Sequence, residues 1–132
     1  MKNKVINISL LELKSIREKL IADDRVFFVE LNGDAVKTIS DYLAIISKSM
    51  YFPIPSRAFD GYYDWMQDLS WINKDRIVCV INQYSKFLSE DIEARDKIIS
   101  GFKDVILPWW ENDVMKHVVN GKKKAFQVYL VE

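Results

Sequence analysis

The chain has 132 residues, with 19 basic and 19 acidic side chains and a hydrophobic fraction of 49%. This length fits one ordinary domain, and the composition is typical of a folded protein rather than a disordered one. A formal net charge of zero argues against a nucleic-acid-binding protein that relies on non-specific attraction to phosphates, because such proteins carry a clear basic excess. It does not argue against a protein partner, because local fields can be strong on a neutral molecule.

The single cysteine, Cys79, excludes an intramolecular disulfide, whereas secreted domains of this size often carry several. Polar residues interrupt the apolar residues at the N-terminus before a signal-peptide core could form. No stretch of the sequence approaches the 18 apolar residues that indicate a membrane span. We therefore expect a cytoplasmic protein with no membrane association.

The first half of the chain predicts one strand and three helices. Apolar residues recur at helical spacing over residues 10–22, and the β-branched and aromatic run 26–31, closed by Asn32-Gly33, predicts a buried strand. A second helix is predicted over residues 35–50, ended by the prolines that follow Phe52. A shorter helix should then cover roughly residues 58–69.

The second half begins with the run 77–81, five apolar residues that predict a second buried strand. Helical spacing then extends from residue 92 to about residue 119, and we expect a kink at Pro108 because proline removes a backbone donor. Asn120-Gly121 is a natural helix C-cap, although the same dipeptide can form the tip of a hairpin. Residues 125–131 predict the last strand.

Strands connected by helices imply parallel pairing, because a helical crossover returns the chain in the same direction. The sequence therefore predicts an α/β domain: a small three-stranded parallel sheet packed with helices, within a single domain spanning residues 1–132.

The residues that usually carry enzyme chemistry are few. The only histidine, His117, lies near the predicted end of the long helix, where an electrostatic role at the C-terminus is commoner than catalysis. Cys79 lies inside a buried strand and is expected to be a small apolar residue. One histidine and one cysteine cannot build the usual zinc sites, and the scattered glycines form no phosphate-binding loop. We expect no enzyme activity, no metal and no cofactor.

The segment 56–71 is the most informative part of the sequence. Wound as a helix at about 100° per residue, it gathers apolar side chains on one arc: Phe59, Tyr62, Tyr63, Met66 and Leu69. Three carboxylates occupy the opposite arc at i, i+4 and i+8: Asp60, Asp64 and Asp68. Such a row is commonly just the solvated face of an amphipathic helix.

Two features favour a binding surface instead. Gly61 is a poor helix former beside the acidic row, where a missing side chain would allow the close approach of another group. Trp65 and Trp71 border the acids, and tryptophan is enriched at protein interfaces.

These residues resemble the barstar family. The pattern from Phe59 to Met66 is similar to the second-helix signature of that family, in which an apolar residue and Asp are followed by a small residue, two bulky ones, an acid and two core residues. The strands at 28–31, 77–81 and 126–129 follow in the family's order. The resemblance covers residues 26–131 and implies a barstar-like fold for that core, with residues 9–22 as an additional N-terminal helix.

The resemblance implies a monomer that inhibits a small ribonuclease in a 1:1 complex, with no direct contact to nucleic acid. In the family, the second helix and the preceding loop enter the active-site groove, and acidic side chains stand where substrate phosphates bind. Asp64 would be the principal phosphate mimic and Asp60 the second anchor. Trp71 matches an aromatic residue just past the helix, and Glu111 is a peripheral contact. Barstar-like proteins often act as immunity proteins, or antitoxins, of bacterial toxins.

The loop before the helix departs from the family pattern. Ser56 stands where a glycine is expected and Ala58 where an asparagine is expected, while Arg57 adds a positive charge to a surface that should meet a basic groove. This departure bears on the identity of the target enzyme more than on the fold. Two alternatives stay open: a barstar-fold module that binds a non-nuclease toxin or an endogenous regulator, and an enzyme with a polar pocket around His117.

Overall fold

The computed structural model describes residues 2–132 and contains a sheet of four parallel strands in the order β1-β4-β3-β2. The strands are β1 (Lys4–Ile8), β2 (Val26–Asn32), β3 (Arg76–Asn82) and β4 (Ala125–Val131). The α-helices are α1 (Leu10–Ala22), α2 (Ile39–Ser49), α3 (Phe59–Met66), α4 (Ile92–Gly101) and α5 (Val114–His117). Short 3-10 turns cover η1 (Gly33–Ala35) and η2 (Tyr84–Lys86), and π-helical turns cover η3 (Phe102–Ile106) and η4 (Trp109–Asp113).

The α/β class and the parallel pairing are confirmed, but the prediction of three strands is wrong, because β1 adds a fourth. β1 pairs with β4 in register from Lys4 opposite Gln127 to Ile8 opposite Val131. It is an edge strand in which the apolar residues are only partly buried and the polar residues Lys4 and Asn7 are exposed. The polar residues that interrupt this apolar segment, and that argue against a signal peptide, are therefore the solvent-facing residues of an edge strand.

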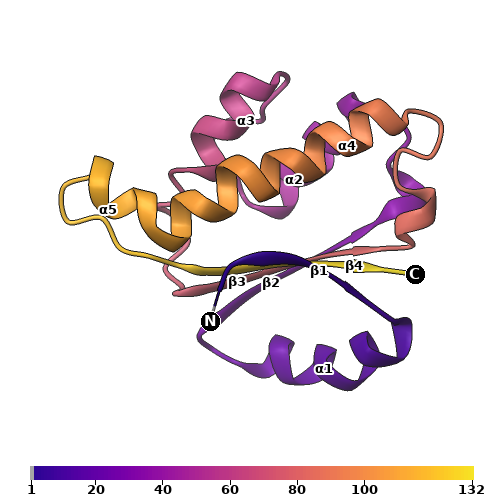
Figure 1. Ribbon diagram of the computed structural model, residues 1–132, viewed down its shortest axis with the longest axis horizontal. Helices are drawn as coiled ribbons and strands as arrows, with labels where there is room; N and C mark the ends of the chain where they lie inside the picture. Colours follow the sequence, from indigo (N-terminus) through magenta and orange to yellow (C-terminus); the bar gives the residue numbers. More distant parts are fainter. Residues whose placement is uncertain (1) are drawn as a thin grey trace.

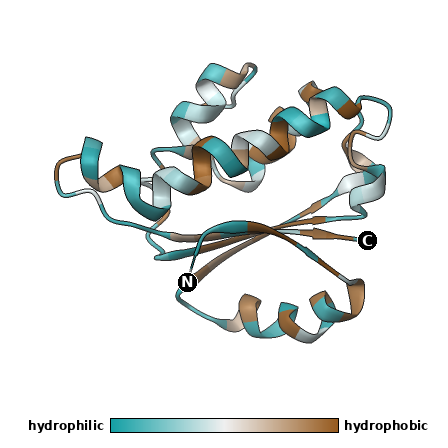
Figure 2. Ribbon diagram, in the orientation of Figure 1, coloured by the Kyte–Doolittle hydropathy of each residue, from teal (hydrophilic) through white to brown (hydrophobic). Residues whose placement is uncertain are grey.

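The helices cover both faces of the sheet (Figure 1). α1 crosses one face on its way from β1 at one edge to β2 at the other, and the remaining helices lie on the opposite face. Figure 2 shows apolar residues along much of the strands between these layers. Two buried clusters result because a parallel sheet covered on both faces buries both sets of side chains. The α1 side consists of Leu13, Leu20, Val26, Val78, Val80 and Val131.

The predicted boundaries of two helices shift. α2 begins at Ile39 rather than at residue 35, because Thr38 and Asp41 form a reciprocal capping box. α3 ends at Met66 rather than at residue 69, and Leu69 adopts a left-handed φ of 47° in the turn that follows.

The long helix predicted from residue 92 is present and runs to His117. It accommodates Pro108 between two π-helical turns, and directly before the proline Leu107 donates to the Phe102 carbonyl, five residues back. The hairpin alternative at Asn120-Gly121 is wrong, because a helix and not a strand precedes this turn. Gly121 is required there: a Cβ atom would lie 2.5 Å from the Val114 carbonyl oxygen.

Candidate partner-binding surface

The inner side of α3 holds the helix against the rest of the protein. Tyr62 and Met66 are fully buried, and Phe59 and Tyr63 are half-buried beside them. The ring of Tyr62 packs edge-on against Phe59 with centroids 6.0 Å apart. From α4, Lys97 Nζ lies 4.3 Å from the centroid of Phe59. The aromatic arc predicted for this segment therefore faces the other helices, and the opposite arc is left to solvent.

The side chains of Asp60 and Asp64 are exposed on that outer arc, one helical turn apart. Within residues 2–132 neither carboxylate forms a salt bridge or a side-chain hydrogen bond, and all four ion pairs of this part of the chain lie elsewhere. Two carboxylates on adjacent turns with no basic side chain paired to them form a concentrated negative patch, available to cations of another molecule.

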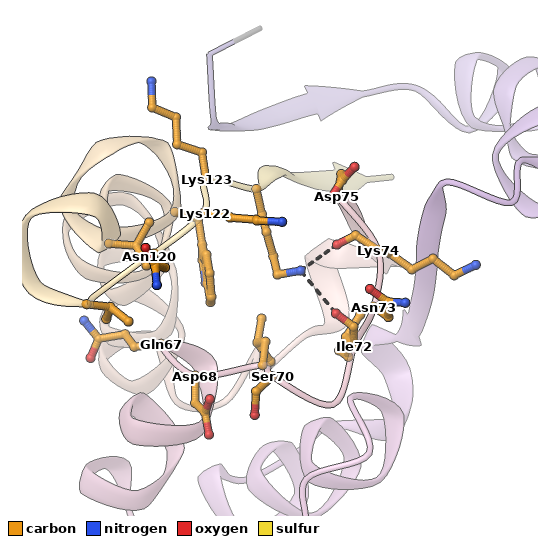
Figure 3. A pocket seen from close by; sticks show the side chains of 16 residues that line it. Gln67, Asp68, Ser70, Ile72, Asn73, Lys74, Asp75, Asn120, Lys122 and Lys123 are labelled. Carbon is orange, nitrogen blue, oxygen red and sulfur yellow. Dashed lines mark hydrogen bonds between the residues drawn. The ribbon is translucent and has the colours of Figure 1, made fainter.

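Asp68 does not continue this row. It lies beyond the end of α3, and its amide donates to the carbonyl of Trp65 in the closing turn. Asp68 instead lies at the rim of a groove between residues 67–75 and 118–124, opposite Asn120 and Lys122 (Figure 3). The predicted row of three acids is therefore reduced to a pair, because the helix ends too early to carry the third.

The lysine at the floor of this groove, Lys124, forms its hydrogen bonds within the chain. Lys124 Nζ donates to the carbonyl oxygens of Ile72 at 3.2 Å and Lys74 at 2.6 Å (Figure 3). The loss of solvation that accompanies its burial lowers the pKa of Lys124. A lysine held in this way joins two loops of the same chain, which is a structural role. Lys122 and Lys123 stay exposed on the groove wall.

Trp65 and Trp71 lie together in an aromatic cluster with Phe52. The centroids of the two indole rings are 5.5 Å apart and that of Phe52 is 6.1 Å from Trp71. Trp71 Nε1 donates to the Met50 carbonyl at 2.8 Å, so its polar group is satisfied within the chain. Both tryptophans are half-buried and keep part of their surface available. Their first role is to attach the loop before α3 to the turn after it.

Two apolar residues of that loop are exposed to a larger fraction than either tryptophan, namely Tyr51 at 70% and Ile54 at 66%. Neither residue stands out in the sequence pattern, because helical and strand periodicity carry no information about loops. The signal that could have identified them is the run Tyr51-Phe52-Pro53-Ile54-Pro55, in which bulky apolar residues and prolines follow one another directly before the acidic helix.

Gly61 faces the same loop. A Cβ atom at this position would lie 3.3 Å from Ser56 Oγ, so the open space beside the acidic pair is partly filled by the chain itself. Together these residues line a shallow depression, here called the entry depression: Ile54, Pro55, Ser56, Arg57, Ala58, Gly61 and Trp65. The side chain of Arg57 is exposed and forms no salt bridge within the described chain.

Glu111 has an intramolecular role that the sequence analysis did not anticipate. Its Oε1 accepts a hydrogen bond from the backbone amide of Asn3 at 2.7 Å. The side chain of Asn3 in turn donates to the carbonyls of Leu107 and Lys124, and its Oδ1 accepts from the amide of Phe126. Glu111 thus attaches the start of β1 to the long helix. Among residues 2–132, no hydrogen bond connects Glu111 to α3, so the acidic pair and Glu111 are not held together.

The two residues considered for catalysis have other surroundings. His117 is exposed and stacks on Trp109, with ring centroids 5.7 Å apart. Cys79 is buried in β3, and burial raises the pKa of its thiol to about 12. Among residues 2–132, no three His, Cys, Asp or Glu side chains gather closely enough to hold a metal ion. In the same part of the chain, no helix is both long enough and apolar enough to cross a membrane.

In a comparison with protein families, the model described as barstar (barnase inhibitor) matches residues 26–130. The match includes β2, α3 and β4 and begins after β1 and α1. No curated protein and no solved structure matches the chain. The family match confirms the resemblance drawn from the second-helix signature.

Proposed function

The chain belongs to the barstar family of barnase inhibitors, and we propose that it inhibits a small ribonuclease by covering the enzyme's active site with α3. The observation that carries this proposal is the pair Asp60 and Asp64, both exposed and both without an intramolecular cation within residues 2–132. A groove that binds RNA is lined with arginine and lysine. Two carboxylates one helical turn apart can form charge-assisted hydrogen bonds with such a groove in place of substrate phosphates.

The roles that we propose for the two aspartates follow the family pattern. Asp64 is the principal phosphate mimic, and Asp60, one turn earlier, is the second anchor. The aromatic cluster supplies rigid apolar surface beside them, since Trp65 and Trp71 are held in place by packing before any partner binds. Rigid aromatic neighbours exclude water around a central charged contact and so strengthen it.

The biological role that we propose is that of an immunity protein, or antitoxin, which protects the producing cell from a ribonuclease toxin. The inhibitor would act as a monomer in a 1:1 complex and would itself carry no enzyme activity. Inhibition by occlusion needs no catalytic group, no metal and no cofactor on the inhibitor.

The test begins with isolation of the partner. The purified, tagged chain is used to capture proteins from its source organism, and each captured protein is assayed for RNA cleavage with and without the chain. We expect a captured ribonuclease whose activity falls stoichiometrically as the chain is added. Barnase itself is the reference enzyme for the same assay.

Asp64→Ala and Asp68→Ala make a matched pair, because both residues are exposed aspartates but only Asp64 lies on α3. We expect Asp64→Ala to weaken inhibition by at least about 30-fold, the effect of a hot-spot loss of about 2 kcal/mol, and Asp68→Ala to weaken it far less. Equal, small effects of both variants would mean that the acidic pair is not the contact surface. A captured partner without nuclease activity would favour the alternative of a barstar-fold module for another protein.

A further inference from the structure

The N-terminus of α3 lacks the cap that the other long helices possess. Ser9, Thr38 and Asp91 each accept a hydrogen bond from the first turn of α1, α2 and α4. The N-cap of α3 is Ala58, which has no side-chain acceptor, and the first bond inside the helix runs from Tyr62 to the Ala58 carbonyl. The amide groups of the first turn therefore point outward without an intrahelical partner, where the helix dipole favours an anion.

A second, independent feature lies directly beneath this turn. Ser56 is 7% exposed, and its hydroxyl has no hydrogen-bond partner within residues 2–132. The hydroxyl faces the first turn of α3, 3.3 Å from the position that a Cβ of Gly61 would occupy. An unpaired buried hydroxyl costs about 1–3 kcal/mol, and since a hydroxyl can donate as well as accept, that of Ser56 is available for a hydrogen bond to a group that approaches this turn.

Arg57 adds a full positive charge at the same place. Its side chain is exposed at the entry depression and, among the described residues, forms no salt bridge. The depression thus places a guanidinium beside the outward amides of the first turn, with the buried Ser56 hydroxyl behind them and a lining that is otherwise mainly apolar. Asp60 stands in the same first turn, but its carboxylate lies on the exposed side and accepts no side-chain hydrogen bond there.

We infer that the entry depression is a carboxylate-binding site which receives an Asp or Glu side chain of the bound partner, next to the cations that meet Asp60 and Asp64. A protein partner offers the carboxylate as its common anionic side chain, and Arg binds carboxylates with two parallel hydrogen bonds. This inference rests on the proposed function and specifies it further. A ribonuclease needs a general base beside its phosphate-binding cations, and the site selects enzymes in which that base is a carboxylate.

The inference accounts for a departure that the family pattern leaves unexplained. A uniformly acidic surface would repel a carboxylate within the target groove, because like charges that face one another oppose binding. Arg57 converts that repulsion into an ion pair. The surface then presents the positive charge of Arg57 beside the negative charges of Asp60 and Asp64, to match a groove that contains a carboxylate as well as cations.

A double-mutant cycle tests this assignment with the ribonuclease captured by the chain. Arg57→Ala is combined with replacement of the nuclease's general-base carboxylate by the corresponding amide, and the dissociation constants of all four pairs are measured. We expect each single change to weaken binding about tenfold, equivalent to about 1.4 kcal/mol, and the double change to add little more. Lys14→Ala, an exposed cation on α1 across the sheet, is the matched control and should change nothing.

Asp64→Ala, measured in the same series, shows whether a negative result contradicts only the carboxylate site or the proposed function as well. If Arg57→Ala behaves like Lys14→Ala, or if its effect is simply additive with the nuclease change, the carboxylate site is wrong even though Asp64→Ala still weakens binding. If Asp64→Ala is also without effect, the proposed function itself is wrong.

A second measurement uses the free protein and sodium acetate as the probe, with sodium chloride at equal ionic strength as the reference. We expect the amide NMR signals of Phe59, Asp60 and Gly61 to shift saturably with acetate, and the shifts to be lost in Arg57→Ala. The same measurement in Asp64→Asn, which removes a neighbouring negative charge, should show tighter acetate binding. Equal responses to acetate and chloride would overturn the assignment independently of any nuclease.

Discussion

The hydroxyl oxygens of Tyr42 on α2 and Tyr62 on α3 lie 2.6 Å apart, and both side chains are fully buried. Their rings pack edge to face with centroids 5.5 Å apart. This contact is the polar link between the helix that presents the acidic pair and the helix before it. Because Tyr62 faces inward, Asp60 and Asp64 on the opposite arc of α3 face outward.

Tyr62→Phe should destabilise the protein by about 1–3 kcal/mol, because the Tyr42 hydroxyl is then buried without a partner. Urea unfolding, followed by tryptophan fluorescence, measures this change. The double variant Tyr42→Phe/Tyr62→Phe should be less destabilised than the sum of the single variants, since it leaves no unpaired hydroxyl. Strict additivity would show that the two hydroxyls do not depend on one another.

Gly101→Ala should also act on α3, although Gly101 lies on α4. A Cβ atom there would be 2.3 Å from the Tyr63 hydroxyl oxygen and 3.2 Å from two carbons of its ring. Alanine favours the helix by about 1 kcal/mol over glycine, but the overlap forces Tyr63 to move, and we expect a net loss of about 1–2 kcal/mol. In a Tyr63→Phe background, which removes the closest atom, the same substitution should cost less or become stabilising. Thermal unfolding of the four proteins gives both values.

The sequence predicts much of the fold because buried elements carry strong periodicity. The strand at 77–81 is apolar throughout and buried, whereas the helix at 10–22 buries Leu13 and Leu20 but exposes Leu11 and Ile21. The predicted bounds of both agree with β3 and α1 to within one residue at each end. β1 escapes prediction because an edge strand buries only part of its side chains, so its polar residues resemble a loop.

The candidate site is less predictable than the fold. The placement of Asp60 and Asp64 outside and Tyr62 inside follows directly from helical periodicity. The loss of Asp68 from the row depends on where α3 ends, and helix ends are set by local turns such as that of Leu69, which periodicity does not encode. Glu111 lies far along the chain from its partner Asn3, and no sequence pattern announces a contact between residues 108 positions apart.

Asn3→Ala should destabilise the protein by at least about 2 kcal/mol, because it removes three side-chain hydrogen bonds that connect β1 to the long helix and to β4. The matched control is Asn7→Ala on β1, whose side chain is exposed and should contribute less than about 0.5 kcal/mol. Urea unfolding of both variants measures the difference. An Asn3→Ala protein as stable as Asn7→Ala would mean that the side-chain hydrogen bonds of Asn3 contribute little to stability.

Association with the nuclease should slow as salt is added. The exposed carboxylates attract a basic groove from a distance, and at physiological ionic strength salt screens this attraction beyond about 8–10 Å. Stopped-flow fluorescence from the tryptophans beside α3 follows this rate. A combined Asp60→Asn/Asp64→Asn variant should associate more slowly at low salt and show a flatter salt dependence, whereas Asp68→Asn should keep the slope nearly unchanged. An unaltered slope in the combined variant would mean that steering originates from another part of the surface.

The buried thiol of Cys79 should make the fold less stable as the solution becomes alkaline. Burial raises the pKa of this thiol from 9.0 to about 12 in the folded protein. Above pH 9 the unfolded chain therefore loses a proton that the folded chain keeps, so fewer protons are bound in the unfolded state and stability falls with rising pH. Between pH 9 and pH 10 this thiol alone should account for a loss of about 1 kcal/mol. The buried Tyr42 and Tyr62, whose pKa values are also raised, add to the loss in the same sense because their unfolded forms are half ionised at pH 10. Cys79→Val keeps a similar volume without an ionisable group, so the free energy of unfolding of this variant, measured with urea, should fall by about 1 kcal/mol less across that interval. An equal decline in both proteins would assign the alkaline loss to other groups.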